Sequence, residues 1–213
     1  MNFDHHLIDR DPFRESVIRM LEEAIIKLEL KPGDRLVETK ISETFGVSRG
    51  PVREAILDLE ARGLVERTPF KGAVVSTLTQ NDIDELKSCR MDVETLAIKI
   101  IFASNKDIIG VVEKLKSMMQ EMVNAAHQNN LPEFLALDYQ FHDELIHQAA
   151  NSLLEEMWKP VSVRLRRYFF LNSRHGYIPL EEAVKQHQAI IDAITAGDAN
   201  KTSELLRAHH CWS

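Results

Sequence analysis

Apolar residues recur at every third or fourth position over most of the chain, which is the period of an amphipathic α-helix. The first such stretch starts at Pro12 and gives way to a Lys-Pro-Gly-Asp turn at residues 31–34, so one helix of about four turns is expected before that turn. A shorter helix is predicted over residues 38–45, where Gly46 ends it. These helices would begin a small N-terminal unit.

A third helix and a hairpin complete this N-terminal pattern. Ser48 is a favourable N-cap for a helix that Gly63 closes. Residues 64–67 and 73–76 have the composition of strands and are joined by a turn that contains Pro and Gly. Three helices and a hairpin, with a tight turn between the second and third helices, are typical of a winged helix-turn-helix. The alternative is a generic small helical module, in which the hairpin is only an edge of the fold and not a DNA-binding wing.

After Thr79 the pattern stays helical almost to the end of the chain, with breaks at pairs of residues that contain Asn or Gly. Long helices joined by short loops form antiparallel bundles. We therefore expect a mostly α protein with a winged helix-turn-helix domain over residues 1–77 and an antiparallel six-helix bundle over residues 78–213. The bundle helices are predicted over residues 80–103, 106–129, 131–149, 152–173, 179–196 and 198–211.

The composition supports a globular protein and excludes several classes. The chain is 44% hydrophobic and 28% charged, which is enough apolar content for a core. Its two cysteines form no CxxC motif, so we expect a reducing compartment and neither a disulfide scaffold nor a cysteine-based zinc finger. No apolar run approaches the roughly 18 residues of a membrane span, and the polar, acidic N-terminus is unlike a signal peptide. A cytoplasmic protein that does not bind membranes is expected.

The net charge is −7, so any contact with nucleic acid must come from a local basic surface. The third helix offers one at its N-terminal end, where unpaired backbone N–H groups also attract phosphate oxygens. Arg49 and Arg53 lie one turn apart, away from the apolar stripe. One of them can contact a base edge while the other contacts the DNA backbone. Lys71 at the hairpin tip is placed to enter a minor groove, although a plain turn is an equal alternative. The candidate DNA-binding residues are Ser48, Arg49, Gly50, Arg53, Lys71 and Gly72.

Four motifs occur in one register between Leu30 and Ser76. They are Pro-Gly-Asp-x-Leu, Gly-Val-Ser-Arg-x-Pro-Val-Arg-Glu-Ala, Leu-Glu-x-x-Gly-Leu and a glycine at the wing. This stretch resembles the N-terminal domain of the GntR family of bacterial transcription regulators, which implies binding to double-stranded operator DNA. Gly50 stands where many relatives carry Thr, so a relative's operator does not transfer to this chain.

One aspartate and three histidines lie on the apolar faces of three predicted bundle helices. Asp138 and His142 are four residues apart, so their side chains lie one above the other on one helix. His187 shares a face with isoleucines of the fifth bundle helix, and His209 shares one with leucines of the last. Burying an unpaired carboxylate or imidazole costs several kcal/mol, so these groups need partners.

Three imidazoles and a carboxylate are plausible ligands for a divalent metal ion, and we expect Zn, with Ni, Mn or Fe(II) as alternatives that the ligands alone do not exclude. The other interpretation is a hydrogen-bonded Asp138–His142 pair beside two ordinary histidines. His147 lies outside the helix face that Asp138 and His142 share, and His210 is a less central alternative to His209. The histidines predicted to be surface or tail residues are His5, His6, His127 and His175.

A second set of motifs runs from Arg90 to His209. It consists of Arg-x-x-x-Glu, Asp-x-x-Phe-His, an Asn, His-x-x-Ile-x-x-Ala-Ile-x-x-Gly-Asp and a last His. This set resembles the C-terminal FCD effector domain of the FadR-type branch of the GntR family, and six helices resemble its VanR-like subgroup. The resemblance implies that the aspartate and three histidines bind a divalent metal beneath a small carboxylate effector. Gln186 replaces a frequent Glu, which weakens a supporting hydrogen bond but leaves the four ligands.

The effector-binding residues are less defined by the pattern. Arg90 lies on an apolar stripe, where it either meets the anionic effector or pairs with Glu94 one turn later. Arg164 and Tyr168 share a face of the fourth bundle helix, and either they reach the effector carboxylate or they lie on the surface. Asn151 is a further candidate, although capping of the next helix is its preferred role.

These patterns favour a DNA-binding transcription regulator, expected to be a repressor, that binds its operator as a homodimer and responds to a small organic acid at or near the metal. A metal-sensing regulator, in which the ion is the signal, is the first alternative. A helical metalloenzyme that uses metal-bound water is the second. No Ser-His-Asp set, glycine-rich phosphate loop or pair of acid/base carboxylates stands out in its support. We therefore expect no enzymatic activity.

Overall fold

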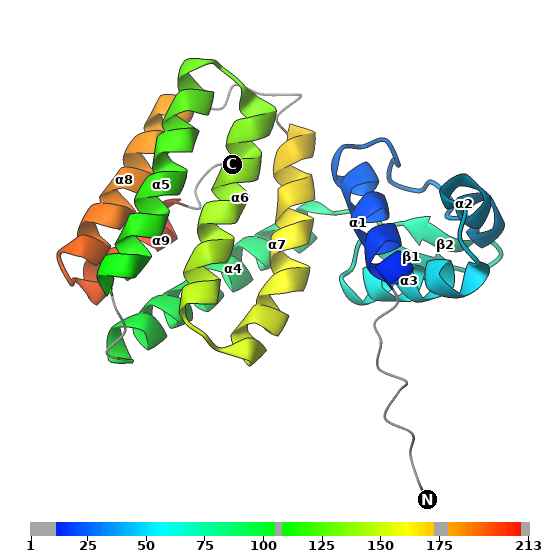
Figure 1. Cartoon of the computed structure of the whole chain (residues 1–213), viewed down its shortest axis with the longest axis horizontal. Helices are drawn as coiled ribbons and strands as arrows, with labels where there is room; N and C mark the ends of the chain where they lie inside the picture. The colour runs from blue at the N-terminus through cyan, green and yellow to red at the C-terminus, as the bar shows by residue number, and fades with distance from the viewer. Residues whose placement is uncertain (1–11, 105–107, 173–178, 210–213) are drawn as a thin grey trace, which may run out of the picture. The chain divides into compact units, whose positions relative to one another are not determined.

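Two compact units make up the computed structural model, which describes residues 12–104, 108–172 and 179–209, and the chain passes from one unit to the other between Thr77 and Leu78. The architecture is mostly α, as predicted. Among the described residues, three helices and a two-stranded wing form the N-terminal unit, and six helices form the C-terminal unit (Figure 1). Within the described ranges, no helix is both long and apolar enough to span a bilayer.

The N-terminal unit has the layout of a winged helix-turn-helix. Its elements are α1 (Pro12–Ile26), α2 (Glu38–Phe45), α3 (Arg49–Ala61), β1 (Val65–Thr68) and β2 (Gly72–Val75). The strands are antiparallel, with Val65 opposite Val75 and Thr68 opposite Gly72. Helix α1 packs against α3, and the apolar faces of these elements are buried. The buried side chains include Val17, Ile18, Leu21, Ile25, Val52, Ile56, Leu59 and Leu64.

Left-handed residues set where these helices end. Gly46 ends α2 with a φ of 65°, and Gly63 follows α3 with a φ of 73°, a conformation that glycine adopts without a Cβ clash. Both ends are where the sequence predicted them. Helix α1 is shorter than predicted, because it ends at Ile26 and Leu28 adopts a left-handed φ of 59°. Leu28 continues the helical spacing in the sequence, so periodicity alone gave no sign of this end.

The six helices of the C-terminal unit form a closed bundle. In Figure 1, α8, α5, α6 and α7 stand side by side in that order, while α4 crosses them obliquely. Helix α4 also contacts α7, and α9 contacts both α4 and α8, so each of these helices packs against at least two others. The helices are α4 (Gln80–Ala103), α5 (Ile108–His127), α6 (Leu131–Gln148), α7 (Ser152–Asn172), α8 (Leu180–Thr195) and α9 (Ala199–His209).

The observed helix bounds lie close to the predicted ones. The largest difference is at the end of α5, which stops at His127 instead of residue 129. The predicted start of α5 at residue 106 and the predicted ends at residues 173 and 211 fall outside the described residues. The pattern of apolar positions was therefore sufficient to place all six bundle helices.

The core of the C-terminal unit is mainly apolar, but it also contains a group of buried polar and charged side chains. Large apolar residues from the six helices fill most of it, among them Ile98, Leu115, Phe141, Leu154, Ile191 and Leu206. The buried polar and charged residues of this unit include Arg90, Glu94, His142, His187 and His209. Buried polar groups are costly unless they are paired, so this group is the part of the fold most in need of a functional explanation.

Candidate functional site

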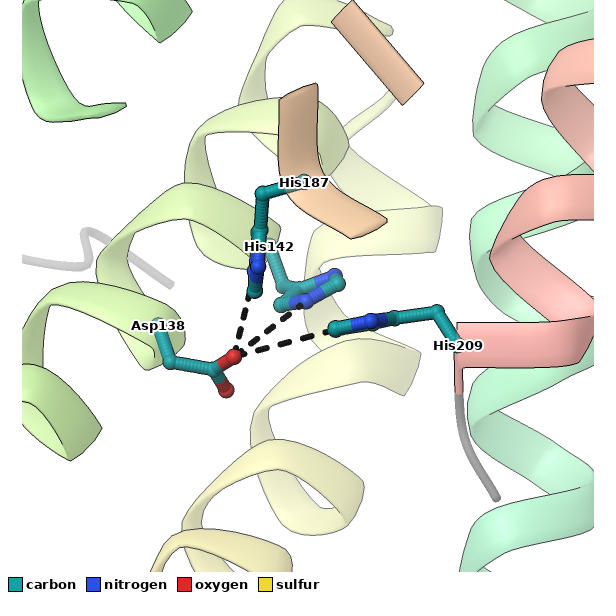
Figure 2. Close-up of side chains that lie close together, drawn as sticks. All are labelled: Asp138, His142, His187 and His209. Carbon is teal, nitrogen blue, oxygen red and sulfur yellow. Dashed lines mark ion pairs between the residues drawn. The ribbon is translucent and has the colours of Figure 1, made fainter. Parts of the chain in front are cut away.

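Four side chains from three helices converge in the core of the C-terminal unit (Figure 2). Asp138 and His142 come from α6, His187 from α8 and His209 from α9. One possible ligand atom from each residue lies within 4.8 Å of all the others. The Nε2 atoms of His142, His187 and His209 lie 3.9, 3.1 and 3.7 Å from Asp138 Oδ1. The structure thus brings together the four residues that the sequence grouped.

The other nitrogen of each imidazole lies beside a hydrogen-bond acceptor. A neutral ring that donates from Nδ1 to such an acceptor carries its lone pair on Nε2. All three lone pairs are then directed toward the space beside the aspartate. The three contacts are His142 Nδ1 with Glu94 Oε1 at 2.9 Å, His187 Nδ1 with the Ala183 carbonyl oxygen at 2.8 Å, and His209 Nδ1 with Gln186 Oε1 at 2.9 Å.

The donor atoms of this cluster suit a divalent cation. His187 Nε2 is buried and has no hydrogen-bond donor among the described residues, although it lies 3.1 Å from Asp138 Oδ1. A ring lone pair and a carboxylate oxygen at this distance repel each other unless a cation or a proton lies between them. One carboxylate oxygen and three imidazole nitrogens match the preferences of Zn, and also those of Ni, Mn and Fe(II).

The protonation states of these side chains at neutral pH also suit metal binding. Burial, followed by the positive charge of Arg90, lowers the pKa of His142 to about 4. Burial is the main reason that the pKa of His209 lies well below its usual value. Burial acts to raise the pKa of Asp138, but when no ion is bound, protons on the rings of His187 and His209 can bond to this carboxylate instead, and these hydrogen bonds hold its pKa well below its usual range. At neutral pH the aspartate is therefore ionised, and His142 and His209 are neutral, as metal ligands must be.

A pocket adjoins the cluster and is formed by residues of α4, α6 and α7. Arg90 lies in its wall, and its Nε donates to Glu94 Oε1 at 3.0 Å. The predicted Arg90–Glu94 pair is therefore present. The same Glu94 oxygen lies beside His142 Nδ1, so one carboxylate connects the pocket arginine to the histidine cluster. The pocket is lined by Arg90, Leu135, Asp138, Tyr139, His142, Trp158, Ser162, Leu165, Arg166 and Phe169.

Two of the predicted effector residues do not line this pocket. Arg164 lies 3.8 Å from Asp82 Oδ1, and the ring of Tyr168 faces Lys87 Nζ at 5.5 Å from the ring centroid. Each helical residue is rotated by about 100° from the one before it, so Arg164 and Tyr168 share a different stripe of α7 from the residues that face the pocket. The pocket-facing residues of α7, which the sequence pattern did not indicate, include Ser162, Leu165, Arg166 and Phe169.

The remaining candidates have ordinary structural roles or lie outside the described residues. Asn151 Oδ1 accepts a hydrogen bond from the Leu154 N–H at 3.1 Å and so caps α7, which was its preferred role. His147 is exposed and lies 3.1 Å from Glu155, and His127 is exposed. The histidines outside the described residues are His5, His6, His175 and His210.

The candidate DNA-binding residues at the start of α3 are exposed. Ser48 occupies the N-cap position, as predicted, but its side chain makes no capping hydrogen bond. The hydroxyl therefore does not compete for the first N–H groups of α3, which are suited to phosphate oxygens. Apart from its chain neighbours and the backbone of its own helix, the described atom nearest to a Cβ added at Gly50 is Ser48 Oγ at 4.0 Å, so this turn has room for a neighbouring molecule.

The charges on α3 are arranged so that its basic end remains available. Arg14 of α1 lies 3.6 Å from Glu54 and 3.0 Å from Asp58, two acidic residues of α3. Neither Arg49 nor Arg53 forms an ion pair with any residue in the described ranges. The acidic side chains of α3 are thus partly neutralised within the unit, while the arginines at its start face solvent.

The hairpin residues Lys71 and Gly72 are exposed at the tip of the wing, where the sequence placed them. The Lys71 N–H donates to the Thr68 carbonyl oxygen at 3.2 Å and closes the turn. The tip therefore presents a positive charge outward from the same unit that carries α3.

Comparison with known proteins identifies a relative for each of the two units. One protein-family model, "FCD domain", matches residues 85–210, and another, "Bacterial regulatory proteins, gntR family", matches residues 13–75. The chain is 26% identical to the HTH-type transcriptional regulator YdhC of Bacillus subtilis strain 168, over 97% of this chain and 91% of the relative. It is 24% identical to the HTH-type transcriptional repressor RspR of Escherichia coli K12, over 98% of this chain and 90% of the relative. The solved structure of McbR/YncC from E. coli has the same fold, with a TM-score of 0.80, 20% identity and 93% of both chains covered.

Proposed function

Because the chain belongs to the GntR family of bacterial regulatory proteins, in the FadR-type branch that carries an FCD domain, we propose that it is a repressor whose affinity for operator DNA is controlled by a small carboxylate bound at a divalent metal. Family membership makes the protein a DNA-binding transcription regulator and not an enzyme. Repression is supported by the name of its E. coli relative. The observation that carries the proposal for the effector is the convergence of three imidazoles and one carboxylate beside a pocket that contains arginines.

Asp138, His142, His187 and His209 would hold the ion. A bound divalent ion is the largest local charge in such a site and attracts the oxygens of an anionic ligand. Four protein ligands also leave positions for ligand oxygens on an ion that prefers six. The ion would therefore favour carboxylates over uncharged molecules in the adjoining pocket.

The pocket walls support a small organic acid as the effector. Arg90 and Arg166 both line the pocket, and a guanidinium group binds carboxylates through paired N–H donors. Leu135, Leu165 and Phe169 give the remaining wall an apolar surface. The acid would act on a homodimer by favouring one arrangement of its two DNA-binding units over another, because an effector can shift only an equilibrium between states that it binds unequally.

A panel of small mono- and dicarboxylic acids tests this proposal. The metal-loaded, full-length protein is titrated onto a duplex that it has enriched from a random library, with each acid present in turn. At least one acid is expected to weaken DNA binding by about 5- to 150-fold, the usual range of allosteric coupling. If no acid changes DNA binding, the metabolite switch is wrong while DNA binding stands. If chelation alone changes DNA affinity, the metal-sensing alternative gains support.

Gln186 offers a finer test of the metal centre, because it orients His209 without touching the ion. Gln186→Ala is expected to weaken metal binding by about 10- to 100-fold, since His209 loses the acceptor on its Nδ1. Gln186→Glu is expected to tighten binding, since an ionised acceptor forms a stronger hydrogen bond. Competition with a chromophoric chelator measures both changes. Gln188→Ala, on the same helix but bonded to Asp192, serves as the control and should match the wild type. Equal affinities for all four proteins would contradict a supporting role for Gln186.

A further inference from the structure

An aromatic residue occupies an unfavourable position at the tip of the wing. The turn from Thr68 to Lys71 is closed by the hydrogen bond between the ends of that segment. Phe70 is the third residue of this turn and has a φ of +66°, while Pro69 precedes it. A proline followed by a left-handed residue is the pattern of a type II turn, in which glycine or asparagine normally takes the third position. A phenylalanine here costs conformational free energy that glycine would not.

The phenyl ring of Phe70 is not buried, so packing does not offset this conformational cost. Its relative exposure is 104%, the highest among the large apolar side chains of the described residues. If the turn served only to join β1 and β2, glycine or asparagine at position 70 would make it more stable. A strained residue that also exposes a large apolar group is therefore a candidate for contact with another molecule.

We propose that Phe70 enters the minor groove of bound DNA and acts as an apolar wedge at a base step. Duplex DNA is the partner that the surroundings favour, because Phe70 is flanked by the exposed Lys71 and Gly72 on a unit that belongs to a DNA-binding family. Lys71 can contact a phosphate while Gly72 lets the backbone approach closely. Apolar side chains inserted between base pairs unstack them and bend the duplex. The wing would then favour flexible pyrimidine–purine steps, in addition to the bases contacted by α3.

The experiment compares stability with DNA affinity in the full-length protein, using a duplex that the wild type has enriched from a random library. Phe70→Gly is expected to bind this duplex at least about tenfold more weakly. Its melting temperature is expected to equal or exceed that of the wild type, because the left-handed strain is relieved. A residue that only stabilised the hairpin would lower both quantities. Phe13→Ala, at another exposed phenylalanine of the same unit, is expected to leave DNA affinity unchanged.

Salt dependence separates the roles of the two residues at the wing tip. Lys71→Ala should reduce the slope of log K against log salt by about 1, since one phosphate contact is lost. Phe70→Gly should leave that slope unchanged and reduce the bend measured by energy transfer between the duplex ends. Wild-type DNA affinity for Phe70→Gly would overturn the proposal. Weaker DNA binding that tracks a loss of self-association in sedimentation would also overturn it, since the ring would then contact a second protein copy.

Discussion

Replacing His187 with alanine is expected to lower the metal content of the purified protein from about one ion per chain to near zero. His187 is fully buried, its Nδ1 is fixed by the Ala183 carbonyl oxygen, and its Nε2 lies closest of the three to Asp138 Oδ1. Loss of a residue that only supports a ligand already costs about 10- to 100-fold in metal affinity, so loss of the ligand itself should cost more. Elemental analysis after dialysis measures the change.

Two further variants separate ligation from packing in this test. Asp138→Asn keeps the shape of the side chain but removes its charge, and it is also expected to lose the ion. His147→Ala removes an exposed histidine of the same helix that lies beside Glu155, and it should retain the wild-type metal content. Circular dichroism checks that each variant is folded. A His187→Ala protein that keeps its metal would remove His187 from the ligand set.

Replacing Arg49 with alanine is expected to weaken operator binding by about 1–3 kcal/mol and to relax sequence preference. Arg49 lies in the exposed first turn of α3 and has no ion-pair partner in the described ranges, so its charge and its N–H groups are available to a base edge. Competition between an enriched duplex and a scrambled duplex of the same length measures both affinity and preference.

The matched control for this experiment is Arg19→Ala, which removes an exposed arginine from α1 of the same unit. This substitution removes one positive charge, as Arg49→Ala does. It should therefore reproduce any general electrostatic loss of DNA affinity but leave the preference for the enriched duplex intact. If Arg49→Ala weakened binding equally to both duplexes, Arg49 would contact phosphates, and Arg53 would be the better candidate for reading bases.

Sequence spacing predicted those parts of the fold and site that depend on local geometry. Asp138 and His142 were grouped because residues four apart on a helix share a face. His187 and His209 were added because each lies among apolar residues that must face the bundle core. The end of α2 at Gly46 was predicted because glycine alone adopts a left-handed conformation without strain.

The rest of the site depends on contacts between helices that spacing does not determine. Glu94 of α4 meets His142 of α6, and no periodic pattern links two helices in this way. The pocket face of α7 carries Arg166 instead of Arg164, because the rotation of that helix about its axis is set by packing against its neighbours. The left-handed Phe70 also went unpredicted, since the sequence places a phenylalanine where turn chemistry favours glycine.

The shared carboxylate of Glu94 gives a physical reason to expect that the ion and the acid bind cooperatively. One oxygen accepts from Arg90 Nε at 3.0 Å and lies 2.9 Å from His142 Nδ1. An anion bound to Arg90 would therefore act on the carboxylate that lies beside His142, one of the proposed metal ligands. Coupling between two binding sites is reciprocal, so an acid that binds better to the metal-loaded protein must also tighten its metal binding.

We propose that an acid releases DNA only through the loaded metal centre. The affinity for the enriched duplex, measured with and without the active acid on metal-loaded and on metal-stripped protein, tests this dependence. We predict that the acid weakens DNA binding by at least about fivefold in the loaded protein and has no effect on the stripped protein. An acid that weakened DNA binding equally in both proteins would contradict a role for the metal in this response.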